Sequence, residues 1–337
     1  MSTLYLVQQG TTVRKVQSRF VIQPTEQSEQ ASLSVPIRDV DRLLVFGNIH
    51  LTTSAISSCL ESHVPVMFLT QTGRYKGHLW SAEQTRFTSE IAQFSQYQNA
   101  EFQLEMARSI VRGKLLNSKQ FLLRLNRKRK LEAVTTAIAG LNRDLNAIAQ
   151  VENLESLRGY EGIASSRYFS AFGALITGSE FQFEGRNRRP PTDPVNSMLS
   201  FGYTLLFNNV LSLILTEGLH PYLGNLHRSD RAEPHLAFDL MEEFRSAIVD
   251  SLVMTLVNRR MVKPDDFQAP DSEGGVYLTD AARRLFLKQF EARMEAQVSH
   301  SSVQDRVSYR YAIQLQIRQY QRCVMNAGQY VPFLRAV

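Results

Sequence analysis

Residues 192–213 read TDPVNSMLSFGYTLLFNNVLSL, and this stretch sets the structural class of most of the chain. The apolar residues that repeat along it are Leu199, Leu206, Val210 and Leu213. Spacings of four and seven residues indicate an amphipathic helix rather than a strand. Just before them, Arg186–Pro194 is too rich in proline to be helical, and Thr192 or Asp193 can cap a helix that begins there. The stretch therefore predicts a helix with one buried face.

The helical pattern continues through the rest of the chain from about Arg86. Two further stripes with helical spacing consist of Phe244, Ile248, Leu252 and Leu256, and of Val303, Val307, Tyr311 and Leu315. Between these stripes, Lys263–Tyr277 contains two prolines and a Gly-Gly pair, which favours a loop with a short hairpin. We therefore expect residues 86–337 to form one all-α domain.

The beginning of the chain has the pattern of β-strands. The residues of one alternating, half-buried strand are Leu33, Val35 and Ile37. The apolar runs 43–46 and 66–69 each end near a glycine and predict short buried strands. Thr52 or Thr53 can cap a short helix between them. The expected fold class is therefore α+β, with a small β-rich domain, residues 1–85, before the larger helical domain.

The composition is that of a globular protein, with 43% hydrophobic and 21% charged residues. No run of about 18 or more apolar residues predicts a membrane-spanning helix, and residues 1–10 lack the regions of a secretory signal. Cys59 and Cys323 lie far apart in apolar surroundings, so we expect two reduced thiols rather than a disulfide or a zinc site. These features favour a cytoplasmic protein.

Positive charge is concentrated in the segment 108–130, which has no acidic residue although the net charge of the chain is only +6. Its basic residues are Arg108, Arg112, Lys114, Lys119, Arg124, Arg127, Lys128, Arg129 and Lys130. An uncompensated run of this kind favours contact with nucleic-acid phosphates. We expect DNA contacts from Arg108, Arg112, Lys114, Arg127, Lys128, Arg129 and Lys130. A solvated surface with no partner is the alternative.

Acidic and histidine residues occur at three separate places in the helical domain. Glu161 lies between two glycines in LRGYEG, and glycines let backbone or ligand approach closely. His227 is expected in a loop, whereas Asp239 and Glu242, three residues apart at the start of a helix, share one face. This face leads into the apolar stripe that begins at Phe244. Carboxylates directed toward a core must be paired or must bind a metal.

One imidazole with two or three carboxylates suits Mn²⁺ or Mg²⁺, and the nitrogen ligand favours manganese. Beside a basic groove, such an ion supports phosphodiester transfer, because it polarises a phosphate oxygen and activates a hydroxyl or water nucleophile. Spacing alone leaves another interpretation open, since acidic residues at a helix N-terminus also interact favourably with the helix dipole.

Several motifs occur in an order that resembles the CRISPR-associated integrase family, the catalytic subunit of spacer acquisition. The resemblance covers nearly the whole chain. The motifs are GNIHLTTSAISSCLESHVPVMFLTQTGRYKG (47–77), ARSIVRGKLLNSKQFLLR (107–124), LRGYEG (157–162), DPVNSMLSFGYTLLFNNV (193–210), GLHPYLGNLHRSDRAEPHLAFDLMEEFR (218–245) and GGVYLTDAARRLFLKQFEARM (274–294).

The resemblance implies the residues of the active site. In that family a Glu, a His and a later acidic residue hold one divalent ion, and these positions fall here on Glu161, His227 and Glu242. Asp239 is the accompanying catalytic acid. Asn196 matches an asparagine that braces the site in the family.

Neighbouring residues are expected to have structural or supporting roles. Glu243 is expected to pair with Arg245 or another base, because only Glu242 has the spacing of three from the preceding acid. The family has other residues at the positions of His220 and His235. We expect His220 to be structural, and His235 to support the site by a hydrogen bond to the carboxylate four residues later.

The resemblance also implies an activity and partners. The activity is attack of a DNA 3′-hydroxyl on a phosphodiester of the CRISPR repeat, with metal-dependent nuclease activity as the corresponding reaction with water. The partners are double-stranded DNA (protospacer and repeat), a second copy bound through the N-terminal domain, and CRISPR-associated protein two. A DNA-binding scaffold without catalysis, and a stand-alone integrase of a mobile element, are the alternatives.

Overall fold

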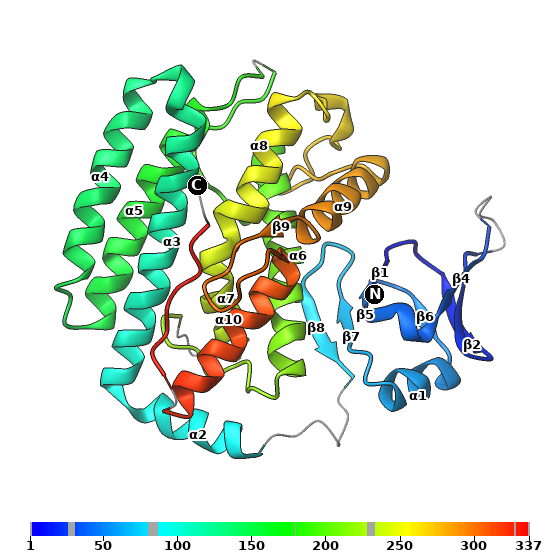
Figure 1. The fold of residues 1–337 in the computed structure, drawn as a ribbon. Helices are drawn as coiled ribbons and strands as arrows, with labels where there is room; N and C mark the ends of the chain where they lie inside the picture. The colour runs from blue at the N-terminus through cyan, green and yellow to red at the C-terminus, as the bar shows by residue number, and fades with distance from the viewer. Residues whose placement is uncertain are drawn as a thin grey trace. The chain divides into compact units, whose positions relative to one another are not determined.

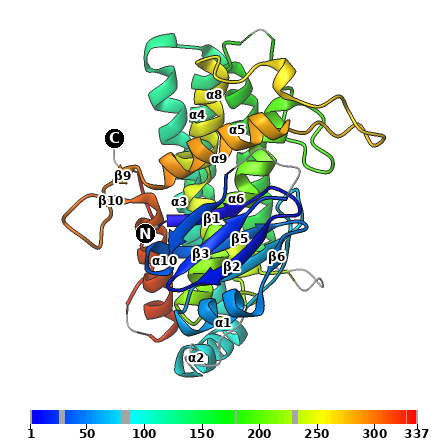
Figure 2. The ribbon, with the colours of Figure 1, turned by 90° about the vertical axis from the view of Figure 1, so that its right-hand side faces the viewer.

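The computed structural model describes residues 2–25, 31–79, 87–178, 180–227, 233–326 and 328–335. The chain divides into two compact units, Met1–Arg86 and Phe87–Val337, drawn in two views in Figures 1 and 2. The first unit holds most of the strands and the second holds the long helices, which confirms the α+β class with strands preceding helices. The expected domain boundary, between residues 85 and 86, lies outside the described residues.

Two four-stranded sheets form the first unit. One sheet has the order β1 (Ser2–Leu6), β5 (Val40–Phe46), β7 (Val66–Leu69) and β8 (Tyr75–His78). The other has the order β4 (Leu33–Pro36), β3 (Arg19–Gln23), β2 (Thr12–Val16) and β6 (His50–Leu51). The apolar runs at 43–46 and 66–69 pair in parallel as β5 and β7, with Leu43 opposite Val66. The alternating segment ends as a strand at Pro36, and Ile37–Asp39 forms a 3₁₀ turn.

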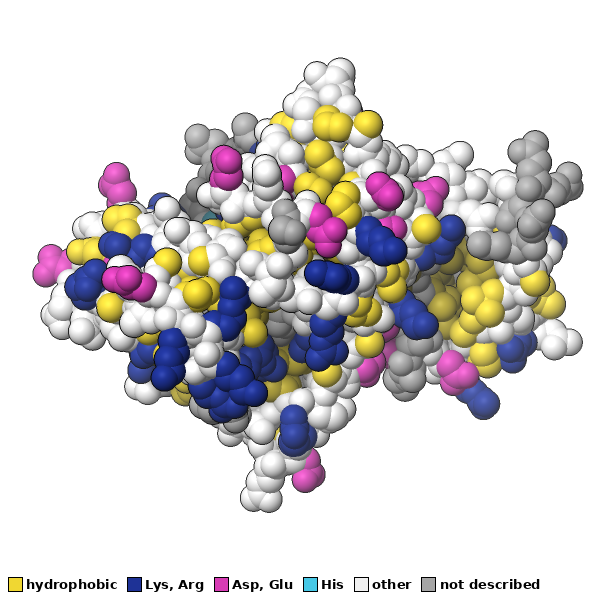
Figure 3. All heavy atoms as spheres, turned by 90° about the horizontal axis from the view of Figure 1, so that it is seen from above, with side chains coloured by type: hydrophobic (Ala, Val, Ile, Leu, Met, Phe, Trp, Pro, Cys, Tyr) yellow, Lys and Arg dark blue, Asp and Glu magenta, His cyan; other side chains and the backbone are white. Residues whose placement is uncertain are grey.

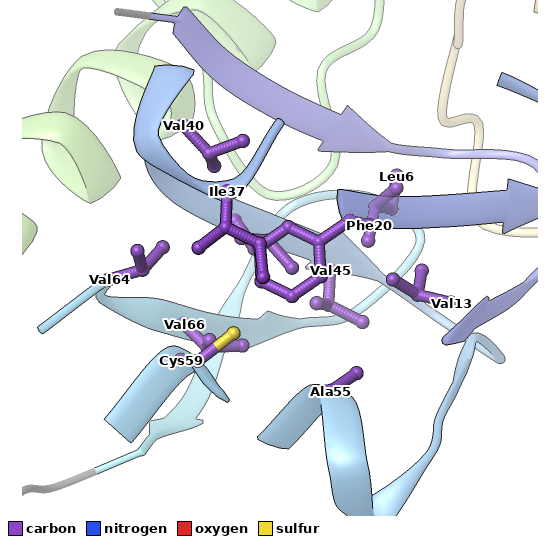
Figure 4. Close-up of a cluster of buried hydrophobic side chains, with 11 residues drawn as sticks. Leu6, Val13, Phe20, Ile37, Val40, Val45, Ala55, Cys59, Val64 and Val66 are labelled. Carbon is purple, nitrogen blue, oxygen red and sulfur yellow. The ribbon is translucent and has the colours of Figure 1, made fainter. Parts of the chain in front are cut away.

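A short helix, α1 (Thr53–Glu61), completes the core of this unit. Its N-cap is Thr52, whose hydroxyl accepts a hydrogen bond from the Ala55 amide at 3.3 Å, as its sequence position predicts. Ala55 and Cys59 of α1 lie in the same buried cluster as Phe20 of one sheet and Val45 of the other (Figure 4). Cys59 and Cys323 are both free and buried, and they lie in different units.

The second unit is built mainly from helices: α2 (Phe87–Gln98), α3 (Ala100–Arg129), α4 (Glu132–Ile148), α5 (Leu154–Ala174), α6 (Pro194–Thr216), α7 (His235–Met241), α8 (Ser251–Asn258), α9 (Asp280–Met294) and α10 (Tyr309–Val324). Helices α3, α4 and α5 pack side by side (Figure 1). Asn99 and Asn153 cap the N-termini of α3 and α5. These caps fix where two of the site-bearing helices begin.

Helix α6 runs through the core of the second unit. Asp193 caps it, because its carboxylate accepts a hydrogen bond from the Asn196 amide at 2.8 Å. Of the described helices, α6 alone is long and apolar enough to cross a membrane, with a mean hydropathy of 1.6. Since 78% of that apolar window is buried in the protein, α6 is best explained as a core helix.

Two of the expected helical stripes are interrupted. The stripe from Phe244 to Leu256 is buried throughout, but it passes through a 3₁₀ turn, η3 (Glu242–Phe244), a π-helix, η4 (Ser246–Asp250), and α8. The helix predicted from the stripe that begins at Val303 is wrong in its first half. Turns continue to residue 306, and a two-stranded hairpin of β9 (Gln297–Val298) and β10 (Val307–Ser308) precedes α10. The Ser308 hydroxyl accepts from the Tyr311 amide and so fixes the start of α10.

Candidate active site

Lys114, Glu161 and Glu242 meet inside the helical unit. Lys114 lies on α3, Glu161 on α5, and Glu242 is the first residue of η3. The Lys114 ammonium contacts a carboxylate oxygen of Glu161 and lies 2.7 Å from Oε2 of Glu242. Because α3 packs against both α5 and η3, tertiary packing brings together residues that are far apart in sequence.

Both carboxylates are held in their charged form. Burial alone would raise the pKa of Glu161, but the charge of Lys114 and its hydrogen bond lower it below the ordinary value. Burial opposes ionisation of Glu242 as well, and the charges of Arg245 and Lys114 outweigh it, so that its pKa is also lowered. Arg245 donates a hydrogen bond from Nη1 to Oε1 of Glu242 at 2.6 Å. The cluster thus contains two carboxylates and two cations.

Asp239 fixes the orientation of His227. The fully buried Asp239 carboxylate accepts hydrogen bonds from the amides of Asn225, Leu226 and His227, and it lies 2.7 Å from Nδ1 of His227. The oxygens of Asp239 therefore act as hydrogen-bond acceptors. Nδ1 of His227 therefore carries the proton, and Nε2 of the neutral ring keeps a free lone pair.

The same carboxylates act on the proton affinity of His227. Burial would lower the pKa of His227, but the hydrogen bond and charge of Asp239, together with the charge of Glu242, raise it above the ordinary value. His227 in turn lowers the pKa of Glu242 through its charge. The imidazole is therefore electrostatically coupled to the carboxylate cluster.

The chemistry of these residues fits a divalent ion, although they are not arranged as a ready-made ligand set. Across the described ranges, no group of three His, Cys, Asp or Glu side chains has the geometry of a metal site. Three features nevertheless match such an ion. Glu161 and Glu242 share one positive charge, and Oε2 of Glu242 is buried without an aligned hydrogen-bond donor. Nδ1 of His227 lies against a carboxylate, which leaves Nε2 of the neutral ring as the possible ligand atom. This last arrangement is typical of metal-binding histidines.

Asp239 therefore lies behind His227 in this structure. Its carboxylate oxygens receive the loop amides and the His227 ring, which suits a residue that positions a ligand rather than one that touches the reacting atoms. The chain segment that carries it also differs from expectation. Helix α7 begins at His235, so Asp239 lies in its middle and Glu242 follows its end, not the start of a helix.

A buried network stands behind Arg245. Asp250, the last residue of the π-helix η4, accepts hydrogen bonds from the hydroxyls of Tyr168 (2.6 Å) and Tyr203. The Arg245 guanidinium lies over the Tyr203 ring, 4.0 Å from its centroid. Asp250 thus connects α5, α6 and the segment that carries Glu242. Single π-turns inside helices are frequent at functional sites.

Asn196 holds a loop next to this network. It is fully buried, and its amide donates to the Gly185 carbonyl at 2.8 Å and accepts from Nη1 of Arg186 at 2.8 Å. The Arg186 guanidinium lies over the ring of Tyr203, 5.4 Å from its centroid. Among the described residues, Arg186, Tyr203 and Arg245 connect Asn196 to the carboxylate cluster.

The two histidines outside the proposed ligand set differ in their surroundings. His235, the first residue of α7, is buried, and a β-carbon at Gly224 would lie 2.6 Å from its own. Only glycine permits the loop that carries His227 to come this close. The expected hydrogen bond from His235 to Asp239 stays a prediction. His220 exchanges backbone hydrogen bonds with the side chain of Gln93 on α2, and burial lowers its pKa.

The expected pairing of Glu243 with Arg245 is wrong, because Arg245 pairs with Glu242. Glu243 points the other way and is fully buried, and it accepts hydrogen bonds from the Phe333 amide (2.7 Å) and the Tyr330 hydroxyl (2.8 Å). The spacing of three residues between Glu242 and Arg245 is a local signal that could have given the correct pair. Residues Asp250, Tyr168 and Tyr203 meet only by tertiary packing and leave no local signal.

The seven residues expected to bind DNA fall into two groups. The charged heads of four pair with no residue in the described part of the chain, and all four are exposed: Arg112, Arg127, Lys128 and Lys130. Figure 3 shows Lys and Arg side chains gathered over the helical unit in a view from above Figure 1. A surface of this kind can contact phosphates.

The other three are already engaged. Arg108 donates to the Val151 carbonyl at 2.6 Å, and Arg129 donates to the Leu175 carbonyl at 2.7 Å, at the C-terminus of α5. Lys114 is only 12% exposed and lies in the carboxylate cluster, so its expected contact with DNA stays a prediction. Helix α3 buries one face against α5 and η3, and Lys114 lies on that face. The exposed cations of α3 lie on its other faces.

Comparison with known proteins identifies a family. The sequence model described as "CRISPR associated protein Cas1" matches residues 4–292. The protein named CRISPR-associated endonuclease Cas1 3, from Thermus thermophilus, is 37% identical to this chain over 314 residues. That alignment covers 93% of this chain and 89% of the relative.

The fold of the chain is also similar to that of several solved structures. A CAS1 protein from Thermotoga maritima matches with a TM-score of 0.81 and 27% identity, over 98% of this chain and 99% of that protein. A casposase bound to integration product matches with a TM-score of 0.86 and 22% identity, over 98% and 93%. A chain of a Cas6-RT-Cas1–Cas2 complex matches with a TM-score of 0.81 and 23% identity, over 98% and 36%. At such identities the last two likenesses concern the fold alone.

Proposed function

Because the chain belongs to the family of CRISPR-associated protein Cas1, we propose that it is a metal-dependent DNA integrase and endonuclease that inserts DNA fragments as new spacers into a CRISPR array. The observation that carries this proposal is the convergence of Glu161 and Glu242 on one buried positive charge. Two ionised carboxylates at this depth require a cation, and they come from separate elements that only the fold unites.

The proposed reaction is a transesterification of DNA. The 3′-hydroxyl oxygen of the incoming fragment forms a bond to a phosphorus atom of the array, and the existing bond from that phosphorus to its 3′-oxygen breaks. The attacking hydroxyl loses its proton, and the leaving oxygen takes one up. When water replaces the hydroxyl, the same exchange is hydrolysis, which accounts for endonuclease activity.

Each site residue has a distinct part in this proposal. Glu161, His227 and Glu242 would hold Mn²⁺ or Mg²⁺, which supplies polarisation of the phosphate and activation of the nucleophile. Asp239 orients the ring of His227 by accepting a hydrogen bond from Nδ1, so that Nε2 of the neutral ring would be the ligand atom. Arg245 keeps Glu242 ionised and fixes one of its oxygens.

We propose double-stranded DNA, from both protospacer and repeat, as the substrate. The exposed cations of α3 would contact its phosphates. A second copy of the chain, bound through residues 1–85, and CRISPR-associated protein two are the proposed protein partners, in the cytoplasm of a prokaryote. The likeness in fold to a chain of a Cas6-RT-Cas1–Cas2 complex supports CRISPR-associated protein two as a partner.

The likeness in fold to a casposase makes a stand-alone integrase of a mobile element the second candidate function. Such an enzyme would use the same residues, so site variants do not separate the two functions. A CRISPR array beside the gene favours spacer acquisition, whereas terminal repeats that flank the gene favour a mobile element. A DNA-binding scaffold without catalysis is disfavoured by the paired, ionised carboxylates.

The test of the active site replaces its proposed ligands one at a time. Glu161→Ala, His227→Ala and Glu242→Ala should each lower strand joining and cleavage roughly 100-fold or more, because a group that stabilises the transition state is removed. DNA binding should change little, and EDTA should abolish the wild-type activity. Glu155→Ala, which removes an exposed carboxylate from the same helix as Glu161, is the matched control and should remain active. Full activity in EDTA would overturn the metal-dependent mechanism.

A further inference from the structure

The cation shared by the proposed ligand carboxylates belongs to the chain itself. Lys114 contacts Glu161 and lies 2.7 Å from Oε2 of Glu242, and these three side chains are 12%, 23% and 4% exposed. Arg245 holds the other oxygen of Glu242. Two negative and two positive side chains therefore balance one another. A divalent ion on the same carboxylates would give the cluster an excess of two positive charges.

We propose that Lys114 is a built-in competitor of the divalent ion: its ammonium holds Glu161 and Glu242 in place until the ion displaces it, and the displaced ammonium then faces the DNA phosphate. The reason is steric and electrostatic. The place between the two carboxylates can be taken by an ammonium group or by a metal ion, but not by both, and the two cations repel each other.

Lys114 is the cation that can move, and Arg245 is the one that cannot. The guanidinium of Arg245 is fixed by the ring of Tyr203 at 4.0 Å and by Oε1 of Glu242. Lysine carries a compact charge on a flexible four-carbon stem, so it can change partners without movement of the backbone. A hollow next to the cluster, lined by Lys114, Ser118 and Ser165 among mainly apolar side chains, leaves space beside the ammonium.

This role of Lys114 explains two observations together. Oε2 of Glu242 is buried and close to an ammonium, yet it receives no aligned hydrogen bond. No three potential ligand side chains in the described part of the chain are arranged for a metal, although their chemistry suits one. Both observations follow if the Lys114 ammonium occupies the place between the two carboxylates that a metal ion would otherwise take.

The test measures Mn²⁺ affinity by calorimetry on metal-stripped protein without DNA. Removal of a competitor should tighten binding, so Lys114→Met should bind Mn²⁺ about 5–150-fold more tightly than wild type, the usual range of coupling between two ligands. Lys114→Arg keeps a competing charge and should show no such gain. Lys119→Met removes a lysine from the same helix and should leave the Mn²⁺ affinity unchanged. Strand joining by Lys114→Met at saturating Mn²⁺ should nevertheless fall, because no ammonium at this position then faces the phosphate.

Opposite changes in Mn²⁺ affinity and strand joining are what a purely structural ion pair cannot give. Unchanged or weaker Mn²⁺ binding by Lys114→Met would overturn the proposed competition. If that variant fails to fold without metal, Lys114→Gln, which keeps hydrogen-bond donors without the charge, should show the same tightening. The inference rests on the proposed metal site, and the two fail differently. If neither wild type nor the variant binds Mn²⁺, the proposed metal site is wrong. If both bind Mn²⁺ with equal, measurable affinity, only the proposed role of Lys114 is wrong.

Discussion

The orientation of the His227 ring depends on the Asp239 carboxylate. Asp239 accepts a hydrogen bond from Nδ1 of His227, and three loop amides hold the carboxylate itself in place. A histidine whose Nδ1–H is fixed in this way presents Nε2 in a single direction. The loss of the Asp239 charge should therefore affect the site through His227 rather than directly.

Asp239→Asn should lower Mn²⁺-dependent strand joining about 10–100-fold, the usual effect of losing a group behind a metal-binding histidine. His227→Ala should be inactive, His235→Ala impaired by at most the same factor, and His220→Ala nearly unaffected. The rates are to be compared among variants of equal thermal stability. A variant series in which His227 is dispensable, but His235 or His220 is required, would show that the ligand assignment is misplaced.

The residue types of the site could be read from sequence motifs, but their contacts could not. LRGYEG and the segment around Asp239 single out Glu161 and Glu242 without indicating that a lysine from α3 lies between them. Lys114 belongs to a basic run whose other members are mostly exposed, so composition predicts the wrong surroundings for it. Its burial follows from the packing of α3, and no local pattern records which face of a long helix will be covered.

At the level of elements, the C-terminus of α3 carries most of the exposed residues of the basic segment. Arg127, Lys128 and Lys130 pair with no residue that the structure describes, whereas Arg129 donates to the Leu175 carbonyl at the end of α5. Basic residues in the last turn of a helix also interact favourably with its dipole. The number of basic residues at the end of α3 is therefore consistent both with DNA binding and with stabilisation of the helix.

A salt titration distinguishes these roles. Replacement of Arg127, Lys128 and Lys130 by Ala should weaken binding to all DNA sequences alike and reduce the slope of log affinity against log salt by about 0.9 for each phosphate that is no longer neutralised. Arg129→Ala alone should leave the slope unchanged and lower the thermal stability, because its guanidinium holds the end of α5. An unchanged slope in the triple variant would place the DNA-binding surface elsewhere.

Elements were predictable where the periodicity and the cap agreed. Asp193 marks the start of α6 and Thr52 the start of α1, and in both a side-chain oxygen accepts the hydrogen bond that the sequence suggests. Spacing alone misled at Val303, because apolar residues of a hairpin and of the following helix happen to fall four apart. A π-turn such as η4 adds a residue to a helix without changing its apolar character, so a stripe cannot reveal it.

In the helical unit as a whole, the end of the chain returns to the segments that carry the site. Residues 328–335 run along α3 (Figure 1), where Asn117 donates to the Phe333 carbonyl at 2.8 Å and accepts from the Arg335 amide at 2.9 Å. A β-carbon at Gly113 would lie 2.6 Å from Pro332, so this segment packs directly on the helix that carries Lys114. Glu243 accepts the Phe333 amide and thereby ties the chain end to η3.

Glu243 makes the stability of this arrangement depend on pH. Burial raises its pKa from 4.5 to about 8, against the smaller opposing effects of hydrogen bonds from Phe333, Tyr330 and Gln316. The folded chain therefore keeps a proton that the unfolded chain releases from about pH 4.5 upward. The stabilisation by this group is complete below pH 4.5 and is lost as the pH rises to about 8, at no more than about 1.4 kcal/mol per pH unit.

Glu243→Gln isolates this contribution, because glutamine mimics the protonated carboxyl and can still donate to Tyr330 and accept from Phe333. The free energy of unfolding of the variant minus that of wild type should rise between pH 5 and about 8 and then level off, as measured by denaturant titration at each pH. Glu132→Gln, which removes an exposed carboxylate, should show no such rise. A constant difference across this range would mean that Glu243 is ionised in the folded chain. The chain end would then be bound to a buried charge, and its removal should destabilise the protein at every pH.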